Sequence, residues 1–143
     1  MLFDNPLQAA NQLSQKLKYE HLPPNSLVTA ITKKGEYFAK PISQNLNLKY
    51  NFLFSLFSAP NQLLQTNSLI LIDDGSTNAQ EYNEYTDKIR KINPKIQIIL
   101  AIPIIPTTEE KLLKKNCDRL IYLHSEKLFF DIKQFYKNTF NIY

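Results

Sequence analysis

The sequence predicts an α/β protein with a single open parallel sheet of five strands, in the order 2-1-3-4-5, and helices on both faces. Short apolar runs alternate with segments of helical periodicity, and each run is apolar at consecutive positions. Continuous apolar strands are typical of parallel sheets that are covered on both faces. Right-handed crossovers allow the stated order, in which the first and third strands are neighbours and the winding reverses between them.

The first helix and the first strand have clear local signals. Asp4 or Asn5 can cap a helix that has Pro6 at its first position, and leucine and alanine recur at helical spacing to about Lys18. The apolar run at residues 27–31 predicts the first strand. A length of 143 residues, with 43% apolar residues, suits one domain over residues 1–143.

The next segment is expected to hold a turn, a second helix and a second strand. Residues 32–36 are interpreted as the turn, and residues 37–46 carry a helical face that Pro41 kinks or delays. Residues 50–57 are rich in phenylalanine and leucine, which indicates a buried strand. Residues 58–67, SAPNQLLQTN, are expected to form a loop with one helical turn.

The second half repeats the alternation of strand and helix. Residues 69–72 form the clearest strand, and a helix with Tyr82, Ile89 and Ile92 on one face follows. Residues 96–102 are another continuous apolar strand.

The last elements are a helix, a strand and an aromatic tail. Thr107 and Glu110 have the spacing of a capping box, which predicts a helix from Thr107 to about Lys115. Residues 119–123 complete the set of five strands. Residues 129–143 are rich in aromatic side chains and are expected to be partly helical.

Composition excludes several classes of protein. Gly35 and Gly75 are the only glycines, so neither G-x-G-x-x-G nor G-x-x-x-x-G-K-[ST] can be written. One cysteine and two histidines exclude a disulfide framework and a metal cluster rich in these residues.

The charge and hydropathy of the sequence limit the kinds of partner that this protein is expected to bind. Seventeen basic residues stand against 13 acids, only two of the basic residues are arginine, and the lysines are dispersed, so no specific nucleic-acid partner is expected. The longest largely apolar run, residues 96–106, is well short of the roughly 18 residues that span a bilayer. No signal peptide is expected at the start, MLFDNP, and a cytoplasmic protein without membrane contact follows.

Both glycines flank the crevice that this strand order predicts. Gly35 follows the first strand and Gly75 follows the third, and open α/β sheets bind ligands at that point, beyond the carboxyl ends of the strands. Asp73 and Asp74 should point in different directions, because side chains alternate along a strand. Gly75 permits a positive φ, and the residues after it offer hydroxyl and N–H donors that suit a phosphate monoester. Asp-Asp-Gly is also a common sequence where a strand ends and a helix follows. A ligand site and a purely structural turn therefore both stay open at this point.

Four collinear segments resemble a known family. LILIDDGSTNAQ resembles the phosphoribosyl-pyrophosphate-binding motif of type I phosphoribosyltransferases. VTAITKKGEYFAKPISQNL is similar to the family's first strand, pyrophosphate loop and following helix, and IILAIPIIPTTEEKL to its next strand and helix. The ending, LHSEKLFFDIKQFYKNTF, looks like the tail of the small bacterial phosphoribosyltransferase-like subgroup.

The resemblance implies residue roles. Asp73 and Asp74 would be the catalytic residues that hold the ribose hydroxyls, directly or through Mg²⁺. A loop around the 5′-phosphate would be formed by Gly75, Ser76, Thr77, Asn78 and Ala79. A pyrophosphate loop would be formed by Lys33, Lys34 and Gly35. The implied ligand is a phosphorylated ribose or a nucleotide.

Departures from the family pattern point to a compact, diverged member. Asn78-Ala79 replaces the usual Thr-Gly pair, and Lys33 and Lys34 stand where many members have arginine and glycine. The connection at residues 58–67, only about ten residues long, lacks the insertion that supplies a lid in active members. Weak or lost phosphoribosyl transfer, dependent on magnesium where it survives, is therefore expected.

The alternative is a non-catalytic interaction or regulatory module that kept the fold. In that case a homodimer or a protein partner would use the edge at residues 52–57, which begins with Phe52 and ends with Phe57, or the aromatic tail.

Overall fold

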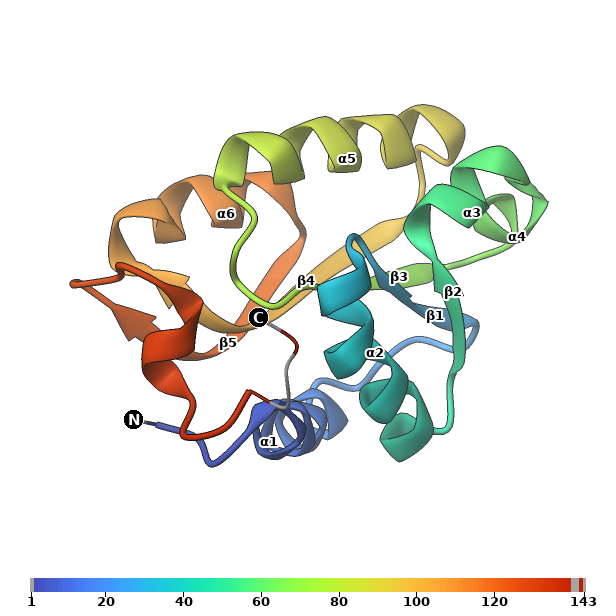
Figure 1. Ribbon diagram of the computed structural model, residues 1–143. Helices are drawn as coiled ribbons and strands as arrows, with labels where there is room; N and C mark the ends of the chain where they lie inside the picture. Colours follow the sequence, from blue (N-terminus) through green and yellow to red (C-terminus); the bar gives the residue numbers. More distant parts are fainter. Residues whose placement is uncertain (1, 140–141, 143) are drawn as a thin grey trace.

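A computed structural model describes residues 2–139 and 142 and confirms the predicted fold class and strand order (Figure 1). The parallel sheet has the order β2-β1-β3-β4-β5. Its strands are β1 (Ser26–Ala30), β2 (Lys49–Phe52), β3 (Ser68–Ile72), β4 (Gln97–Pro106) and β5 (Arg119–Glu126). The helices are α1 (Pro6–Lys18), α2 (Lys33–Leu46), α3 (Leu53–Ser58), α4 (Asn61–Leu64), α5 (Ala79–Ile92) and α6 (Glu110–Asn116), with short 3-10 helices η1 (Thr107–Glu109) and η2 (Ile132–Phe135).

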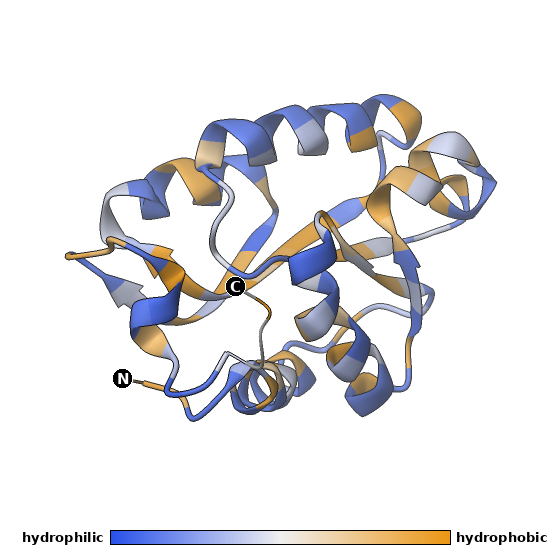
Figure 2. Ribbon diagram, viewed as in Figure 1, coloured by the Kyte–Doolittle hydropathy of each residue, from blue (hydrophilic) through white to orange (hydrophobic). Residues whose placement is uncertain are grey.

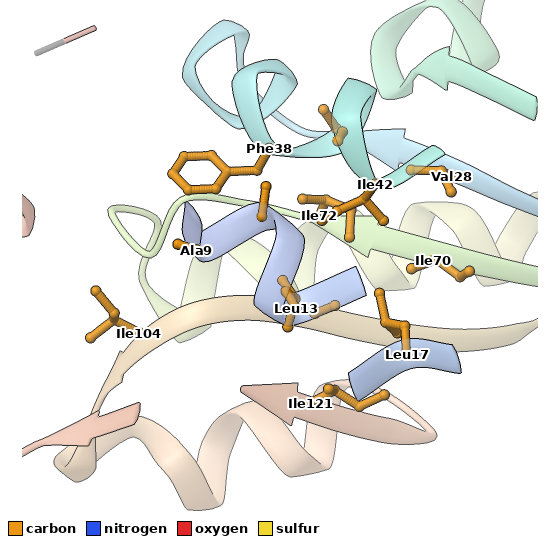
Figure 3. Packing of buried hydrophobic residues seen from close by; sticks show 14 of the residues in the cluster. Ala9, Leu13, Leu17, Val28, Phe38, Ile42, Ile70, Ile72, Ile104 and Ile121 are labelled. Atoms are coloured by element: carbon orange, nitrogen blue, oxygen red, sulfur yellow. The ribbon is translucent and has the colours of Figure 1, made fainter. Parts of the chain in front are cut away.

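The helices cover both faces of the sheet, as expected. Ile70 and Ile72 of β3 pack in one core layer with α1 and α2, and Figure 3 shows the contributions of Leu13 and Phe38 to this layer. Leu69 and Leu71, the alternate residues of β3, pack in the opposite layer, beneath the helices from α3 to α6. Figure 2 shows the apolar strands between helices whose outer faces are polar. Because both faces of β3 and β4 are buried, these central strands are apolar at consecutive positions, whereas β2 and β5 at the edges of the sheet are only partly buried.

Side-chain caps set the starts of the long helices. The side-chain oxygens of Asn5, Thr32 and Asn78 each accept a hydrogen bond from the backbone N–H three residues ahead, at distances from 2.9 to 3.0 Å. The turn predicted at residues 32–36 is therefore wrong, because Thr32 is an N-cap and α2 begins directly after it. Pro41 lies inside α2.

The strand predicted over residues 50–57 ends early. β2 stops at Phe52, and α3 places Leu53 and Leu56 on one buried face while Phe54 is 44% exposed. A continuous apolar run does not distinguish a strand from a short buried helix by its pattern. The connection from β2 to β3 spans residues 53–67 and is folded into α3 and α4, not left as a ten-residue loop.

The last two strands extend beyond their predicted ends. β4 continues to Pro106, and β5 pairs with it as far as Glu126. The predicted capping box is wrong: no side-chain cap forms at the start of η1 or α6, and the Thr107 hydroxyl instead lies 2.7 Å from the Ser125 hydroxyl. This contact depends on the register of β4 and β5.

The aromatic tail packs back on the amino terminus. η2 follows β5, and Tyr136 pairs with Phe3 in a parallel bridge. Residues 140, 141 and 143 of the predicted tail lie outside the described residues. Among the residues that the structure describes, no helix is long and apolar enough to cross a membrane.

Candidate functional site

The residues singled out from the sequence gather at the carboxyl ends of two neighbouring strands. Ala30 of β1 is in register with Ile72 of β3, so the start of α2 and the loop after β3 leave the sheet side by side. This edge holds Lys33, Lys34, Gly35, Asp73, Asp74, Gly75, Ser76, Thr77, Asn78 and Ala79. Lys33, Lys34 and Gly35 are the first turn of α2, Asn78 is the cap of α5 and Ala79 its first residue.

Asp73 is fully buried and accepts hydrogen bonds at both carboxylate oxygens. Its Oδ2 accepts from the Tyr82 hydroxyl at 2.5 Å and from the Thr77 N–H at 3.3 Å, and its Oδ1 accepts from the Thr32 hydroxyl at 3.3 Å. Burial, and then the nearby charge of Asp74, raise the pKa of Asp73 to about 6. This carboxylate therefore joins the cap of α2, the loop and α5.

Asp74 is also fully buried but acts within the loop. Its Oδ1 accepts from the Ser76 N–H at 2.9 Å and from the Ser76 hydroxyl at 2.6 Å. Burial, with a smaller effect from the charge of Asp74, raises the pKa of Tyr136, which belongs to the core layer of α1 and α2. Asp73 bonds Tyr82 in the opposite layer, so the two side chains point in different directions, as alternation requires.

The two glycines are needed for different reasons. Gly75 has a φ of +106°, and a Cβ on it would lie 2.5 Å from the Ile104 carbonyl oxygen. Gly35 is helical, and a Cβ there would lie 3.3 Å from the Ile72 carbonyl oxygen. Both positions bring the chain close to the ends of neighbouring strands.

The start of α5 receives a carboxylate from a distant part of the chain. The Ala79 N–H donates to Oε1 of Glu109 at 3.3 Å, and the Ala79 carbonyl accepts from the Asn116 side chain at 2.7 Å. Sequence reasoning missed Glu109, because nothing near it in the chain indicates that η1 lies beside α5.

A cavity of about 400 Å³ opens at this edge, lined by Lys34, Ser76 and residues 129–133 of the tail. Lys133 brings a second cation to it, and Asp131 caps η2 beside it. Lys33 lines a different pocket with Glu36 and Tyr37 of α2, so the two neighbouring lysines serve different surfaces. The fold of the tail decides the place of Lys133, which no local motif indicates.

The two carboxylates do not fit a magnesium site in this arrangement. Both are buried, and the chain's own donors occupy both oxygens of Asp73 and one of Asp74. Magnesium needs carboxylate oxygens that face its water or a phosphate. Within the described part of the chain, no group of three or more histidine, cysteine, aspartate or glutamate residues is placed to hold a metal ion.

Solved structures share this architecture at low sequence identity. The Thermus thermophilus protein TT1426 superposes with a TM-score of 0.77 at 13% identity, over 96% of this chain and 91% of that one. The Helicobacter pylori xanthine-guanine-hypoxanthine phosphoribosyltransferase gives a TM-score of 0.63 at 10% identity, over 91% and 88% of the two chains. A Staphylococcus aureus hypoxanthine phosphoribosyltransferase gives 0.61 at 11% identity, over 94% and 84%. No protein-family model and no curated protein sequence matches the chain. The structural likeness confirms the phosphoribosyltransferase-like fold.

Proposed function

Starting from the phosphoribosyltransferase-like fold, we propose that this chain binds a phosphorylated ribose, as phosphoribosyl pyrophosphate or a nucleotide 5′-phosphate, with weak or lost phosphoribosyl transfer. The observation that carries the proposal is the cavity between Lys34, Ser76 and the tail. It opens where open α/β sheets bind ligands, and two lysines line it.

The cations and the hydroxyl of the cavity suit the phosphate of such a ligand, while Asp131 adds a carboxylate to the same lining. Lys34 and Lys133 supply positive charge for a phosphate, and the Ser76 hydroxyl is a hydrogen-bond donor.

Asp73 and Asp74 are proposed to shape the loop. Direct contact with ribose hydroxyls or with magnesium would require these buried carboxylates to give up their bonds to Tyr82, Thr77 and Ser76. In their present positions they hold the N–H groups of the loop in one conformation. We therefore assign no step to magnesium.

The connection between β2 and β3 supports weak transfer. Residues 53–67 fold into α3 and α4, and Leu53, Leu56 and Leu63 are fully buried in the core. A segment held in this way is not available as a lid, and a lid normally excludes water while an activated sugar reacts.

Titration calorimetry with phosphoribosyl pyrophosphate and ribose 5-phosphate, with and without Mg²⁺, tests the proposal. We expect Lys34→Ala and Lys133→Ala each to weaken binding about tenfold, since each removes a charge-assisted contact. Lys91→Ala removes an exposed lysine at the far end of α5 and should leave the affinity unchanged. Absence of binding at millimolar ligand, or equal effects of all three variants, would overturn the proposal.

The interaction module stays the second candidate because aromatic side chains are exposed at the open edge of the sheet. β2 is an edge strand, and Phe54, beside it on α3, packs edge-to-face against Tyr85 while 44% exposed. For a homodimer through this edge, sedimentation should show a dimer that Phe54→Ser dissociates. A monomer at high protein concentration would count against it.

A further inference from the structure

We infer that Asp131 determines the specificity of the cavity, because its carboxylate accepts hydrogen bonds from sugar hydroxyls while the lysines hold the phosphate of the same ligand. The inference rests on the proposed function and narrows its ligand to a sugar phosphate, as opposed to a bare phosphate anion. It starts from the lining of the cavity, to which Asp131 contributes a carboxylate beside Lys34, Ser76 and Lys133.

The charge of the lining does not suit a phosphate alone. Among the described residues of the lining, two lysines and one aspartate leave one net positive charge. Because like charges repel, the Asp131 carboxylate lowers the affinity of the cavity for any anion. A ligand that also carries hydroxyl groups gains hydrogen bonds to a charged acceptor, which are stronger than bonds to a neutral one. The lining therefore favours a ligand with both phosphate and hydroxyl groups.

The cap of η2 does not by itself require a charge at this position. The Asp131 Oδ1 accepts from the Lys133 N–H at 2.9 Å, and Asp131 and Gln134 form a capping box. Asparagine and serine cap helices as aspartate does. The cap therefore explains an oxygen acceptor at position 131 and leaves the carboxylate charge unexplained.

The Asp131 carboxylate can accept more hydrogen bonds than the cap supplies. A carboxylate has about four lone-pair positions, and the cap uses only part of them. Asp131 is exposed, and no lysine, arginine or histidine of the described residues forms an ion pair with it. Ligand hydroxyls can therefore bond to it without breaking the cap.

Asp73 and Asp74, the acids that the family resemblance assigns to the ribose hydroxyls, lack this freedom. Both are fully buried and hold Tyr82, Thr77 and Ser76 of the chain itself. Among the described residues that line the cavity, Asp131 is the carboxylate that a ligand can reach. In this chain the tail therefore supplies the acceptor for the sugar.

The fold fixes the place of Asp131 relative to the loop after β3. The neighbouring Ile132 is buried, and its Cδ1 would lie 3.2 Å from a Cβ on Gly75, so the tail contacts the loop one residue before Ser76. The Asp131 N–H donates to Oε1 of Gln134 at 3.0 Å. These contacts hold the carboxylate beside the cavity before any ligand binds.

The test compares ribose 5-phosphate with inorganic phosphate by titration calorimetry on the whole chain, without metal and at a pH where both are dianions. Asp131→Asn keeps a capping oxygen and removes the charge. We expect it to weaken binding of ribose 5-phosphate about three- to tenfold, because hydroxyl bonds to a charged acceptor are lost. The same variant should tighten binding of inorganic phosphate about twofold, because a like charge is removed.

Two further variants serve as checks. Asp131→Ser also keeps a capping oxygen without a charge, so it should shift both affinities in the same directions as Asp131→Asn. Asp87→Asn removes a carboxylate from an exposed position on α5 and should leave both affinities unchanged. Melting temperatures of all three variants should stay close to that of the wild type, since no core contact or cap is lost.

The outcomes separate the inference from the proposed function. Opposite shifts for the two ligands in Asp131→Asn support the inference, since a purely structural role would move both affinities together. Weaker, tighter or unchanged binding of both ligands would overturn the inference and leave the proposed function standing. Absence of binding of ribose 5-phosphate and of inorganic phosphate to every variant and to the wild type would overturn both.

Discussion

At the scale of single residues, burial of the Asp73 carboxylate couples the stability of the fold to pH. Its pKa, about 6 in the folded chain, lies above the ordinary value of 3.8, so the folded state holds the proton more tightly than the unfolded chain. The stabilisation from this group is complete below about pH 4 and is lost as the pH rises through about 6.

Asp73→Asn should remove this pH dependence. Between pH 4 and pH 7 we expect the free energy of unfolding of the wild type to fall by about 1–3 kcal/mol relative to the variant. Urea titrations followed by circular dichroism at several pH values measure it, since the chain has no tryptophan. Glu84→Gln should keep the wild-type profile, and an unchanged profile in Asp73→Asn would contradict the assignment.

The two glycines should respond differently to a methyl group. Gly75→Ala is expected to lower the free energy of unfolding by about 2–4 kcal/mol, because it combines a positive φ with a Cβ 2.5 Å from a carbonyl oxygen. Gly35→Ala should cost less than Gly75→Ala, because Gly35 is helical and alanine favours a helix, although its Cβ would lie in a tight contact 3.3 Å from the Ile72 carbonyl oxygen. Equal costs in urea titrations would argue against the loop conformation.

At the scale of elements, α3 shows that packing against the core decides whether a short apolar run becomes a strand or a helix. Residues 53–57 have no polar residue at strand spacing apart from Ser55, so their pattern permits either structure. The helix buries Leu53 and Leu56 together against the layer that also holds Leu63 and Tyr82.

This arrangement predicts which side chains carry stability. Leu53→Ala and Leu56→Ala should each cost about 2–5 kcal/mol, because each leaves a cavity in a fully buried site. Phe54→Ser should cost less than about 1 kcal/mol, since Phe54 is 44% exposed. A strand would instead bury positions 53, 55 and 57 on one face, so a costly Phe57→Ala with a tolerated Leu56→Ala would contradict α3.

At the scale of the whole molecule, the two ends of the chain are bound to each other. The Phe3 N–H donates to the Phe135 carbonyl at 2.9 Å, and the Lys137 N–H donates to the Phe3 carbonyl at 3.0 Å. Ile132, Phe135 and Tyr136 of the tail are buried in the same core layer as α1 and α2. The tail is therefore part of the fold as well as a wall of the cavity.

Removal of the tail should destabilise the whole chain. A truncation after Phe130 deletes these three buried side chains and is expected to abolish the cooperative thermal transition. Phe130→Ser, at a residue that is 83% exposed, should keep the transition within a few degrees of the wild type. A truncated chain with a wild-type melting temperature would show that the tail is not part of the core.

The sequence by itself determined the features that depend on neighbours within a few positions. The cap of α1, which the sequence left between Asp4 and Asn5, joins groups three residues apart, and Gly75 comes three residues after the end of β3. The predicted strand order is one that the alternation of apolar runs with helices and right-handed crossovers allow, and the structure confirms it.

Only the tertiary structure decided which side chains of the site are buried, which groups they bond to and which residues line the cavity. Asp73 and Tyr82 meet because α5 packs over the sheet in the layer that holds Tyr82. Ala79 and Glu109, which are 30 residues apart, meet because β4 pairs with β3 and leads into η1. Lys133 reaches the cavity because the tail packs against α2 and the loop after β3. Burial of carboxylates and the choice of hydrogen-bond partners are set by contacts between distant segments, and no local pattern encodes those contacts.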